Sequence, residues 1–427
     1  MWADVGLRAG GLPTRWVGGA AGSVVWAQVG LWGGGLPTRS VRAAAVAVAN
    51  GDDGAMMQAM RTDLPPMDTA ARADALRAAM EAAEVDVLLV TELANIRYLT
   101  GFTGSAARLV VTPDALTFVT DGRYGQQSEA QLAAAGVEAA IEVAGGQGQR
   151  EAIEAAVAAA SGSRLGLEAG SVTWAAQRTY AEWFESSELV PTTSLVEGLR
   201  KVKDAGEVAR IEAACGIADA ALTEVRHRLA EGPTEAEFGL ELDATMRRLG
   251  AEDVSFETIV AAGPNGALPH HRPSDRTIAE GDLVVIDFGA LLDGYHSDMT
   301  RTIMVGEWTP TQQRMFEVVR DSQAAGVAAV AAGVETEAVD KACRDVIDEA
   351  GWGDAFIHST GHGVGLDIHE APSVAATASS ELAAGHVVTV EPGVYLSEHG
   401  GVRIEDTVVV TADGCRTLTL ATKSPSI

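Results

Sequence analysis

Apolar runs and helix-like segments alternate along the first half of the chain, beginning near Asp68. Runs of strand length, which predict β-strands, lie at residues 85–90, 108–112, 116–120, 137–143 and 164–168. Segments with helical periodicity lie near residues 68–81, 122–135, 147–160 and 174–186, and Asp68 is in position to cap the first of them. Strands that alternate with helices are typical of layered α/β proteins, so we predict a small α/β domain over residues 61–198.

The second half of the chain has a different pattern, in which helices accompany many short strands joined by hairpins. A long helix is predicted near residues 204–229, and Gly232-Pro233 ends it. Thr234 and Glu237 have the spacing of a capping box for the next helix. Further helices are predicted near residues 310–331 and 335–350. We place the domain boundary at about 197–203 and assign residues 199–427 to a second domain.

The first 60 residues differ from the rest of the chain and are predicted to form a disordered leader. The segment is rich in glycine, lacks amphipathic periodicity and contains one imperfect repeat at an offset of 24 residues. One repeat is too few for a solenoid. We expect the functional protein to start at Met56, Met57, Met60 or Met67. Mass spectrometry of the native N-terminus checks this, because peptides from before Met56 contradict it.

Composition excludes several classes of function. Hydrophobic residues make up 47% of the 427 residues, yet no run of about 18 apolar residues predicts a membrane-spanning helix. Acidic residues outnumber basic ones by 59 to 31, and the net charge of −28 disfavours nucleic acid and anionic lipid as partners. The three cysteines form no CxxC pair, so we expect buried, reduced thiols in a cytoplasmic protein.

Two aspartates stand in a predicted hairpin of the second domain. Asp287 lies within an apolar strand, and Asp298 lies in the next strand, after the turn-forming sequence Leu292-Asp293-Gly294. A turn centred near residues 292–293 places the two carboxylates opposite each other, about 5 Å apart at Cβ, where they repel. A divalent cation between them removes that conflict.

Two glutamates repeat this construction later in the chain. Glu391 ends an apolar strand and Glu405 follows a glycine-rich turn, with the midpoint of the pair at residue 398. For one hairpin alone, stabilisation by Arg301 or Arg403 explains the buried acids as well as a metal ion does. Two such hairpins in one domain favour the metal.

A histidine cluster supplies the third element of the predicted site. His358, His362 and His369 fall within twelve residues and are interleaved with glycines, which allow close approach of the backbone. Four carboxylates and one imidazole form an oxygen-rich site that suits two divalent ions with shared carboxylates. Such an ion pair lowers the pKa of a bridging water and stabilises a tetrahedral intermediate, so we predict hydrolysis of an acyl bond.

The ordered series Asp287, Asp298, His362, Glu391 and Glu405 resembles the metal-ligand set of the pita-bread metallopeptidases, which include methionine aminopeptidase, aminopeptidase P and prolidase. The surrounding words VVIDFGA, HSDMTRT, STGHGVGLDIHE, VEPGVY and GVRIEDT are similar too. The resemblance covers about residues 200–420. Upstream, NIRYLTGF at 95–102 resembles the smaller N-terminal domain of aminopeptidase P and prolidase. The resemblance implies an α/β (α+β) protein, with a pita-bread catalytic domain after a creatinase/prolidase-type α/β domain.

The resemblance also implies a role for each ligand. Asp287 is expected to bind one metal ion and His362 with Glu391 the other, while Asp298 and Glu405 bridge the two. A metal-bridging hydroxide is then the expected nucleophile, and Glu391 is expected to move its proton.

Other residues take their expected roles from the same resemblance. The histidines expected to contact the substrate or its tetrahedral intermediate are His270, His358 and His369. Tyr395 and Arg403 are expected to orient the ligands. His271 is expected to be non-catalytic, because only one histidine is needed there, and His296 is left unassigned.

By this resemblance the chain is expected to be an Xaa-Pro aminopeptidase of the aminopeptidase P type, with the dipeptide-specific prolidase as the alternative. Proline removes an amide N–H and fixes φ, so its peptidases need a dedicated pocket. A creatinase-like metal-free hydrolase and a non-catalytic binding module are more remote alternatives, and the complete ligand set argues against both. We expect two divalent ions (manganese first, otherwise cobalt, iron or zinc), proline-containing peptides as substrates, and a cytoplasmic homodimer.

Overall fold

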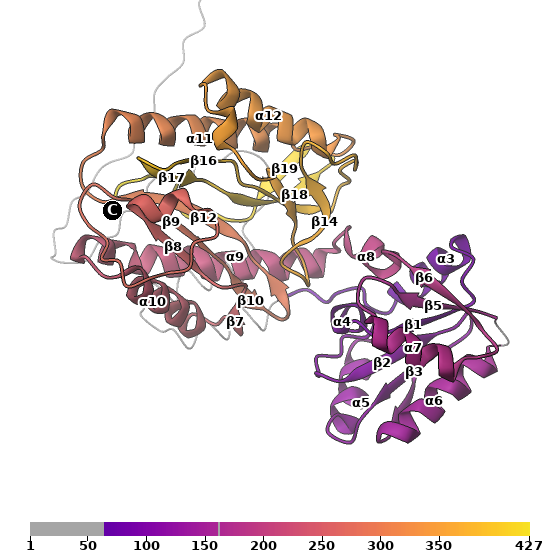
Figure 1. Cartoon of the computed structure of the whole chain (residues 1–427). Coiled ribbons are helices and arrows are strands. Elements are labelled where there is room, and N and C mark those ends of the chain that lie inside the picture. Colours follow the sequence, from indigo (N-terminus) through magenta and orange to yellow (C-terminus); the bar gives the residue numbers. More distant parts are fainter. Residues whose placement is uncertain (1–63, 161–162) are drawn as a thin grey trace, which may run out of the picture. The chain divides into compact units, whose positions relative to one another are not determined.

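The structure is a computed structural model that describes residues 64–160 and 163–427 (Figure 1). The predicted leader over residues 1–60 lies outside the described residues, as do three of the proposed start positions, Met56, Met57 and Met60. Residues 64–200 contain one six-stranded sheet with its helices. Residues 201–427 contain several smaller sheets and four longer helices.

The six-stranded sheet has the order β4-β3-β2-β1-β5-β6. Its strands are β1 (Val87–Val90), β2 (Ala107–Val111), β3 (Leu116–Thr120), β4 (Ala140–Val143), β5 (Arg164–Glu168) and β6 (Glu188–Thr192). Strands β1, β5 and β6 run parallel, and so do β3 and β4, whereas β2 is antiparallel to both of its neighbours. Every residue of β1 is buried, as its uninterrupted apolar sequence leads one to expect of a strand covered on both faces.

Helices cover both faces of this sheet. They are α3 (Arg72–Ala82), α4 (Leu93–Thr100), α5 (Gly125–Ala134), α6 (Gly146–Ala159), α7 (Trp174–Trp183) and α8 (Leu195–Arg200). Leu88 and Val90 of β1 belong to a core with apolar residues of α3, α4 and α5. Val87 and Leu89, which point to the opposite face, belong to a core with α6 and α7. The structure therefore has the layered α/β arrangement that the alternating pattern predicts.

The expectation that Asp68 caps the first helix is wrong. Helix α3 begins at Arg72, and its N-cap is Ala71, which has no side-chain bond to the helix. Asp68 lies too far upstream to reach the first turn, and its backbone N–H donates to Asp204 Oδ2 at 2.9 Å.

The helices of residues 201–427 form two pairs. They are α9 (Ala205–Val225), α10 (Glu235–Arg248), α11 (Pro310–Ala329) and α12 (Thr336–Glu349), with short 3₁₀ segments η1 (Arg226–Glu231), η2 (Gly263–Ala267) and η3 (Gly353–Ala355). The predicted capping box of Thr234 and Glu237 is confirmed at the start of α10. Asp204 and Glu207 form a second capping box at the start of α9.

The strands of this region run from β7 to β19 in chain order, and most of them lie between the two helix pairs (Figure 1). They are β7 (Asp253–Val254), β8 (Ile259–Ala262), β9 (Leu283–Phe288), β10 (Ala290–Leu292), β11 (Tyr295–His296), β12 (Met299–Met304), β13 (Gly361–Gly363), β14 (Glu370–Val374), β15 (Val387–Val390), β16 (Gly393–Leu396), β17 (Gly400–Arg403), β18 (Asp406–Thr411) and β19 (Gly414–Thr417). Sheet β12-β9-β8 shares a core with α9 and α10, and sheet β14-β13-β15-β18-β19 shares one with α11 and α12. The site residues thus come from strands held on both sides.

The register of the first hairpin differs from the expected one. Asp287 on β9 pairs with Thr300 on β12, and not with Asp298. The turn is centred on Asp293-Gly294, because these two residues take the positive φ values, 46° and 71°, that a tight hairpin turn requires. This centre lies one residue beyond the expected one, so the residue paired with any position on β9 lies two residues further along the chain than expected.

The register of the second hairpin is the expected one. Gly393 pairs with Arg403 between β16 and β17, and Val390 pairs with Asp406 between β15 and β18. Both pairings have their midpoint at residue 398. Glu391 and Glu405 lie between these two paired segments, at matching positions.

Two further expectations concern cysteines and membranes. Cys215 and Cys343 are buried free thiols, but Cys415 is only partly buried, because it lies on the edge strand β19. The expectation of a buried thiol is therefore wrong for Cys415. Within residues 64–160 and 163–427, the search for a helix long and apolar enough to cross a membrane finds none.

Candidate metal centre

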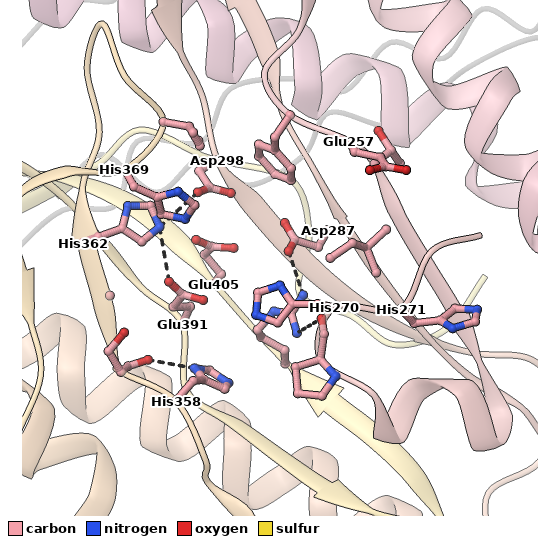
Figure 2. Close-up of a pocket in the computed structure, with 18 of the residues that line it drawn as sticks. Glu257, His270, His271, Asp287, Asp298, His358, His362, His369, Glu391 and Glu405 are labelled. Carbon is pink, nitrogen blue, oxygen red and sulfur yellow. Dashed lines mark hydrogen bonds and ion pairs between the residues drawn. The ribbon is translucent and has the colours of Figure 1, made fainter. Parts of the chain in front are cut away.

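A cavity of about 440 Å³ opens among the strands of the C-terminal region (Figure 2). Nine of the residues predicted for the site line it: His270, Asp287, Asp298, His358, His362, His369, Glu391, Arg403 and Glu405. Tyr395 is almost fully buried and contacts two of these residues. The structure therefore brings together residues that lie up to 135 positions apart in the sequence.

Three of the predicted ligands form a tight group. Asp298, His362 and Glu405 each offer one ligand atom, and these atoms lie within 4.8 Å of one another. His362 Nε2 is 3.4 Å from Asp298 Oδ2 and 3.5 Å from Glu391 Oε1. Figure 2 shows the carboxylates of Asp298, Glu391 and Glu405 gathered around the His362 ring, with Asp287 on the other side of Glu405.

Backbone pairing fixes where these side chains start. Asp287 is on β9, and Asp298 directly precedes β12, which is hydrogen-bonded to β9. His362 is the central residue of β13. The amide N–H of Glu405 donates to Thr300 O at 3.1 Å, and that of Glu391 donates to Thr360 O at 2.8 Å. Each carboxylate is therefore attached to a backbone segment that cannot move independently.

His362 has the protonation state of a metal ligand. Its Nδ1 lies 3.0 Å from the carbonyl oxygen of Gly363, and since a carbonyl only accepts, Nδ1 carries the proton. Burial lowers the pKa of the imidazole to about 4, so the ring is neutral at physiological pH. The Nε2 lone pair then faces the oxygens of Asp298 and Glu391. Acceptors that face one another at such distances need a proton or a cation between them.

The carboxylates carry the same electrostatic conflict. Burial, followed by repulsion from neighbouring carboxylates, raises the pKa of Asp298 and of Glu405 well above its ordinary value. Burial is the main cause that raises the pKa of Glu391 to about 8. Asp287 Oδ1 and Glu405 Oε1 are buried and have no hydrogen-bond partner. Orphaned oxygens beside a neutral imidazole fit a group of divalent cations, which this donor set suits.

Arginine neutralises only part of this charge. Arg403 is buried and donates to Asp287 Oδ2 at 2.7 Å. One acid of the first hairpin is therefore paired with an arginine, which was the alternative to a metal ion. Arg301, in contrast, donates to the side chain of Asp406 at 2.9 Å and to backbone carbonyls. No arginine ion pair is found for Asp298, Glu391 or Glu405 among the described residues. The arginine alternative therefore fails for three of the four acids.

Arg403 and Tyr395 connect the ligands with the histidines. Besides Asp287, the Arg403 guanidinium donates to Tyr395 OH at 2.9 Å and, at 3.4 Å, to the carbonyl of Pro269, which precedes His270. Tyr395 OH lies 2.8 Å from His358 Nε2. Burial lowers the pKa of His358 to about 4, so this ring is also neutral. The ring of His369 is 4.3 Å from that of His362.

His271 lines the cavity but is engaged elsewhere. Its Nε2 lies 2.8 Å from Glu235 Oε2, and Figure 2 shows the ring pointing away from the carboxylate group. Glu235 is fully buried and also accepts hydrogen bonds from the amide N–H of Ala262 and from Ser274. His296, which the sequence left unassigned, is bonded to Ser255 and does not line the cavity.

Two threonines of the site were missed by the sequence analysis. Thr300 Oγ1 donates to Glu405 Oε2 at 2.7 Å, and Thr389 Oγ1 donates to Glu391 Oε1 at 3.2 Å. Thr300 is two residues after Asp298, and Thr389 is two residues before Glu391. Residues two apart on a strand share a face, so this spacing was the signal that could have revealed them.

Comparison with known proteins agrees with this geometry. Residues 209–412 match the model of metallopeptidase family M24, and residues 72–202 match the creatinase/prolidase N-terminal domain. An uncharacterized peptidase of Bacillus subtilis, YqhT, is 42% identical over 339 residues, which cover 79% of this chain and 95% of the relative. The chain belongs to metallopeptidase family M24.

Solved structures agree with the M24 assignment. A Xaa-Pro dipeptidase from Bacillus anthracis is 38% identical with a TM-score of 0.80, covering 83% of this chain and 98% of that one. An X-Pro aminopeptidase from Thermotoga maritima is 32% identical with a TM-score of 0.76, covering 82% of this chain and 100% of that one. The predicted fold, a pita-bread domain after a creatinase-like α/β domain, is confirmed. The chain is thus a metallopeptidase, and its cluster of acids and His362 could hold metal.

In this M24 metallopeptidase the two adjacent histidines are expected to differ sharply. His270→Ala should lower kcat by about 10²-fold, because it removes a donor that faces the cavity. His271→Ala should lower kcat by less than about 10-fold, because its ring is turned toward Glu235. Steady-state kinetics on a proline peptide, with metal content measured in parallel, test the difference. Equal losses in the two variants would contradict it.

Proposed function

We propose that this protein is a two-metal exopeptidase that cleaves the bond between an N-terminal residue and a following proline, as an aminopeptidase P does. The observation that carries the proposal is the convergence of a neutral imidazole lone pair on three acids for which residues 64–160 and 163–427 supply no arginine ion pair. Such an arrangement is electrostatically unfavourable on its own, and divalent cations relieve it.

The residues that would hold the ions are Asp287, Asp298, His362, Glu391 and Glu405, with Asp298 and Glu405 shared between the two. When bound, such ions lower the pKa of a water molecule and stabilise developing negative charge. We propose manganese as the working metal, with cobalt, iron or zinc as the other candidates. Elemental analysis of protein purified without added metal tests the number and the kind of ions.

The remaining side chains orient the substrate and move protons. Glu391 lines the cavity with its Oε1 3.5 Å from His362 Nε2, and we assign it the transfer of the proton from the attacking water. His270 and His369 line the cavity and are assigned to the substrate carbonyl. Neutral His358 is fixed by Tyr395, which in turn accepts from Arg403, so these three act as one hydrogen-bonded unit.

The cavity also suits the peptide around proline. Phe256, Ile259 and Ile368 give it apolar wall area for a pyrrolidine ring. Proline offers no N–H to the enzyme, so an apolar wall there leaves no donor unsatisfied. At the rim, Arg272 is 80% exposed and Glu257 is 59% exposed, so the cavity opens to solvent on that side. This opening supports substrates that continue beyond proline.

Prolidase activity, confined to Xaa-Pro dipeptides, is the second candidate. The names of the similar proteins favour it, because the Bacillus anthracis structure and a Pyrococcus horikoshii relative that is 35% identical are both Xaa-Pro dipeptidases. A creatinase-like activity and a purely binding function fit less well, since neither needs a complete set of metal ligands.

Matched substrates decide among these functions. An Ala-Pro dipeptide, an Ala-Pro-Ala tripeptide and an Ala-Ala-Ala control would be assayed with manganese and again after chelation. We expect the tripeptide to be cleaved at least as efficiently as the dipeptide, the control not at all, and chelation to abolish activity. Cleavage of the dipeptide alone would establish a prolidase. Full activity after exhaustive chelation would contradict the metal-dependent mechanism.

The resemblance alone supports two further proposals, that the enzyme is a homodimer and that it works in the cytoplasm. Light scattering of the purified protein measures the first. Fractionation of the cells that produce it tests the second.

A further inference from the structure

A cluster of buried charges lies directly beside His369. The next residue, Glu370, has a side chain only 7% exposed, and its carboxylate accepts from Arg200 Nη2 at 2.8 Å and from Lys203 Nζ at 2.5 Å. The side chains of Arg200 and Lys203 are 3% and 1% exposed. Arg200 Nη2 also reaches Asp367 Oδ2 at 2.6 Å, on the half-exposed side of the cluster.

Stability alone is a weak reason for such a cluster. Removing three charged groups from water costs free energy that their mutual attraction only partly returns, and apolar residues of similar volume are often at least as stable. A buried ion cluster does, however, fix geometry, because a displaced partner leaves a charge uncompensated. The position of whatever is attached to Glu370 is therefore closely defined.

The segment that Glu370 closes carries two histidines of the site. It runs from His362 on β13 to His369, directly before β14. The chain folds tightly over the Glu370 carboxylate, since a Cβ at Gly365 would lie only 2.4 Å from its nearest oxygen. The amide N–H of Gly365 donates to Asp367 O at 3.1 Å within the same turn. Movement of the Glu370 carboxylate would thus move His369 relative to the His362 ring.

One cation of the cluster, Arg200, is itself oriented from the N-terminal region. Arg200 Nη1 donates to Asn95 Oδ1 at 2.8 Å. The Asn95 amide nitrogen donates to Glu168 Oε1 and to Glu197 Oε1, both at 2.7 Å. Since those two carboxylates only accept, they fix which end of the fully buried Asn95 faces Arg200. A continuous hydrogen-bonded path therefore leads from β5 through Arg200 to Glu370.

We propose that Arg200, Lys203 and Glu370 are positioning residues that set the location of His369 in the cavity, and that the N-terminal sheet acts on the site through Asn95. This inference rests on the proposed function, which places His369 against the substrate. It gives the N-terminal α/β region a role in the reaction beyond packing.

The competing explanation is a simple tether between the two regions of the chain. A second ion pair between these regions distinguishes the tether explanation from the positioning role. Arg97 on α4 donates to Asp293 Oδ1 at 2.8 Å, in the turn between β10 and β11, and neither residue lines the cavity. If tethering were the only role, loss of Arg97 would have the same effect as loss of a cluster member.

The test compares Glu370→Gln and Lys203→Met with Arg97→Met, all loaded with manganese and assayed on the same proline peptide. We expect Glu370→Gln and Lys203→Met to lower kcat by ~10–100-fold, the effect typical of a misplaced catalytic group, with metal content unchanged. The kcat of Arg97→Met should stay within about 2-fold of the parent value, because this change breaks only a contact between the two regions. Lys203→Arg, which keeps the charge, should recover most of the activity lost in Lys203→Met.

A double-variant cycle identifies the route of the effect. In a His369→Ala background, Glu370→Gln should lower kcat by less than about a further 2-fold, because the group that Glu370 positions is already absent. Additive losses, a loss in Arg97→Met as large as in Glu370→Gln, or full activity in Glu370→Gln would each overturn the proposal. If Glu370→Gln does not fold, Lys203→Met replaces it in the cycle.

A readout without catalysis keeps this inference separate from the proposed function. The ring resonance of His369, assigned by its loss in His369→Ala, should shift in the NMR spectrum of Glu370→Gln and stay in place in Arg97→Met. An unchanged resonance in Glu370→Gln would refute the positioning role even if peptide cleavage is observed. A shifted resonance in a protein that cleaves no proline peptide would refute only the proposed function.

Discussion

Replacing Asp298 or Glu405 with alanine will lower turnover of a proline peptide by at least ~10³-fold while the protein stays folded. Each change removes a carboxylate proposed to be shared by both ions, and metal ions contribute several kcal/mol of charge stabilisation, at about 1.4 kcal/mol per tenfold in rate. The fold should persist because each of these carboxylates is repelled by its neighbours in the metal-free site. Steady-state kinetics, elemental analysis and circular dichroism measure the three outcomes.

Glu207→Ala is the matched control for this prediction. Glu207 is 2% exposed, as deeply buried as Glu405 at 1%, but it belongs to the α9 capping box and does not line the cavity. Its loss should reduce stability and leave turnover within a few-fold of the parent. Turnover above a tenth of the parent value in Asp298→Ala or Glu405→Ala would show that the shared-ligand assignment is wrong.

Local sequence signals predicted elements in both halves of the chain. The apolar run at 164–168 became β5, and the Thr234–Glu237 spacing became the capping box of α10. The midpoint at residue 398 gave the correct register for the second hairpin. These features succeed because they depend on side-chain alternation and on bonds between near neighbours, which the sequence displays directly.

The errors came from features that a single pattern does not determine. For the first hairpin, the turn signal Leu292-Asp293-Gly294 spans three residues, and only the need for two adjacent positive φ values selects the last two. Asp68 has a side chain suited to capping, but the helix begins only at Arg72. Such choices are settled by tertiary structure.

The partners of charged residues were the least predictable part of the site. Arg403 was expected to orient ligands, and the structure adds which one, Asp287, and which tyrosine. The contact between Arg200 and Glu370 joins residues 170 positions apart, and no periodicity links them. A buried arginine or lysine almost always has a charged partner, but only the fold shows which residue that partner is.

The metal-free protein will lose stability as pH rises from 6.5 to 8, and divalent metal will restore it. Burial and mutual repulsion raise the pKa of Asp298 and Glu405 well above ordinary values, and burial raises that of Glu391 to about 8. The unfolded chain has already released these protons in this window, and the folded protein holds them to a higher pH, so the free energy of unfolding falls as pH rises. Each carboxyl that stays protonated in the folded protein lowers the free energy of unfolding by up to about 1.4 kcal/mol per pH unit.

The window is chosen so that other groups do not hide the effect. Burial lowers the pKa of His358, His362 and His386 to about 4, so below an ordinary histidine pKa of about 6.5 they make stability rise with pH. Above pH 6.5 that opposing contribution declines and is small by about pH 7.5, and below pH 8 thiol ionisation has hardly begun. The melting temperature of the metal-free protein should therefore fall by roughly 5–10 °C between pH 6.5 and 8.

Calorimetry with and without manganese tests this expectation. Metal binding replaces the protons, so the melting temperature should rise more on addition of manganese at pH 8 than at pH 6.5. The double variant Asp298→Asn with Glu405→Gln, which cannot ionise at two of the three positions, should show a much flatter pH dependence without metal. A melting temperature that is constant or rises between pH 6.5 and 8 in the metal-free parent would mean that these acids are not in conflict. The case for cations at this site would then lose its electrostatic basis.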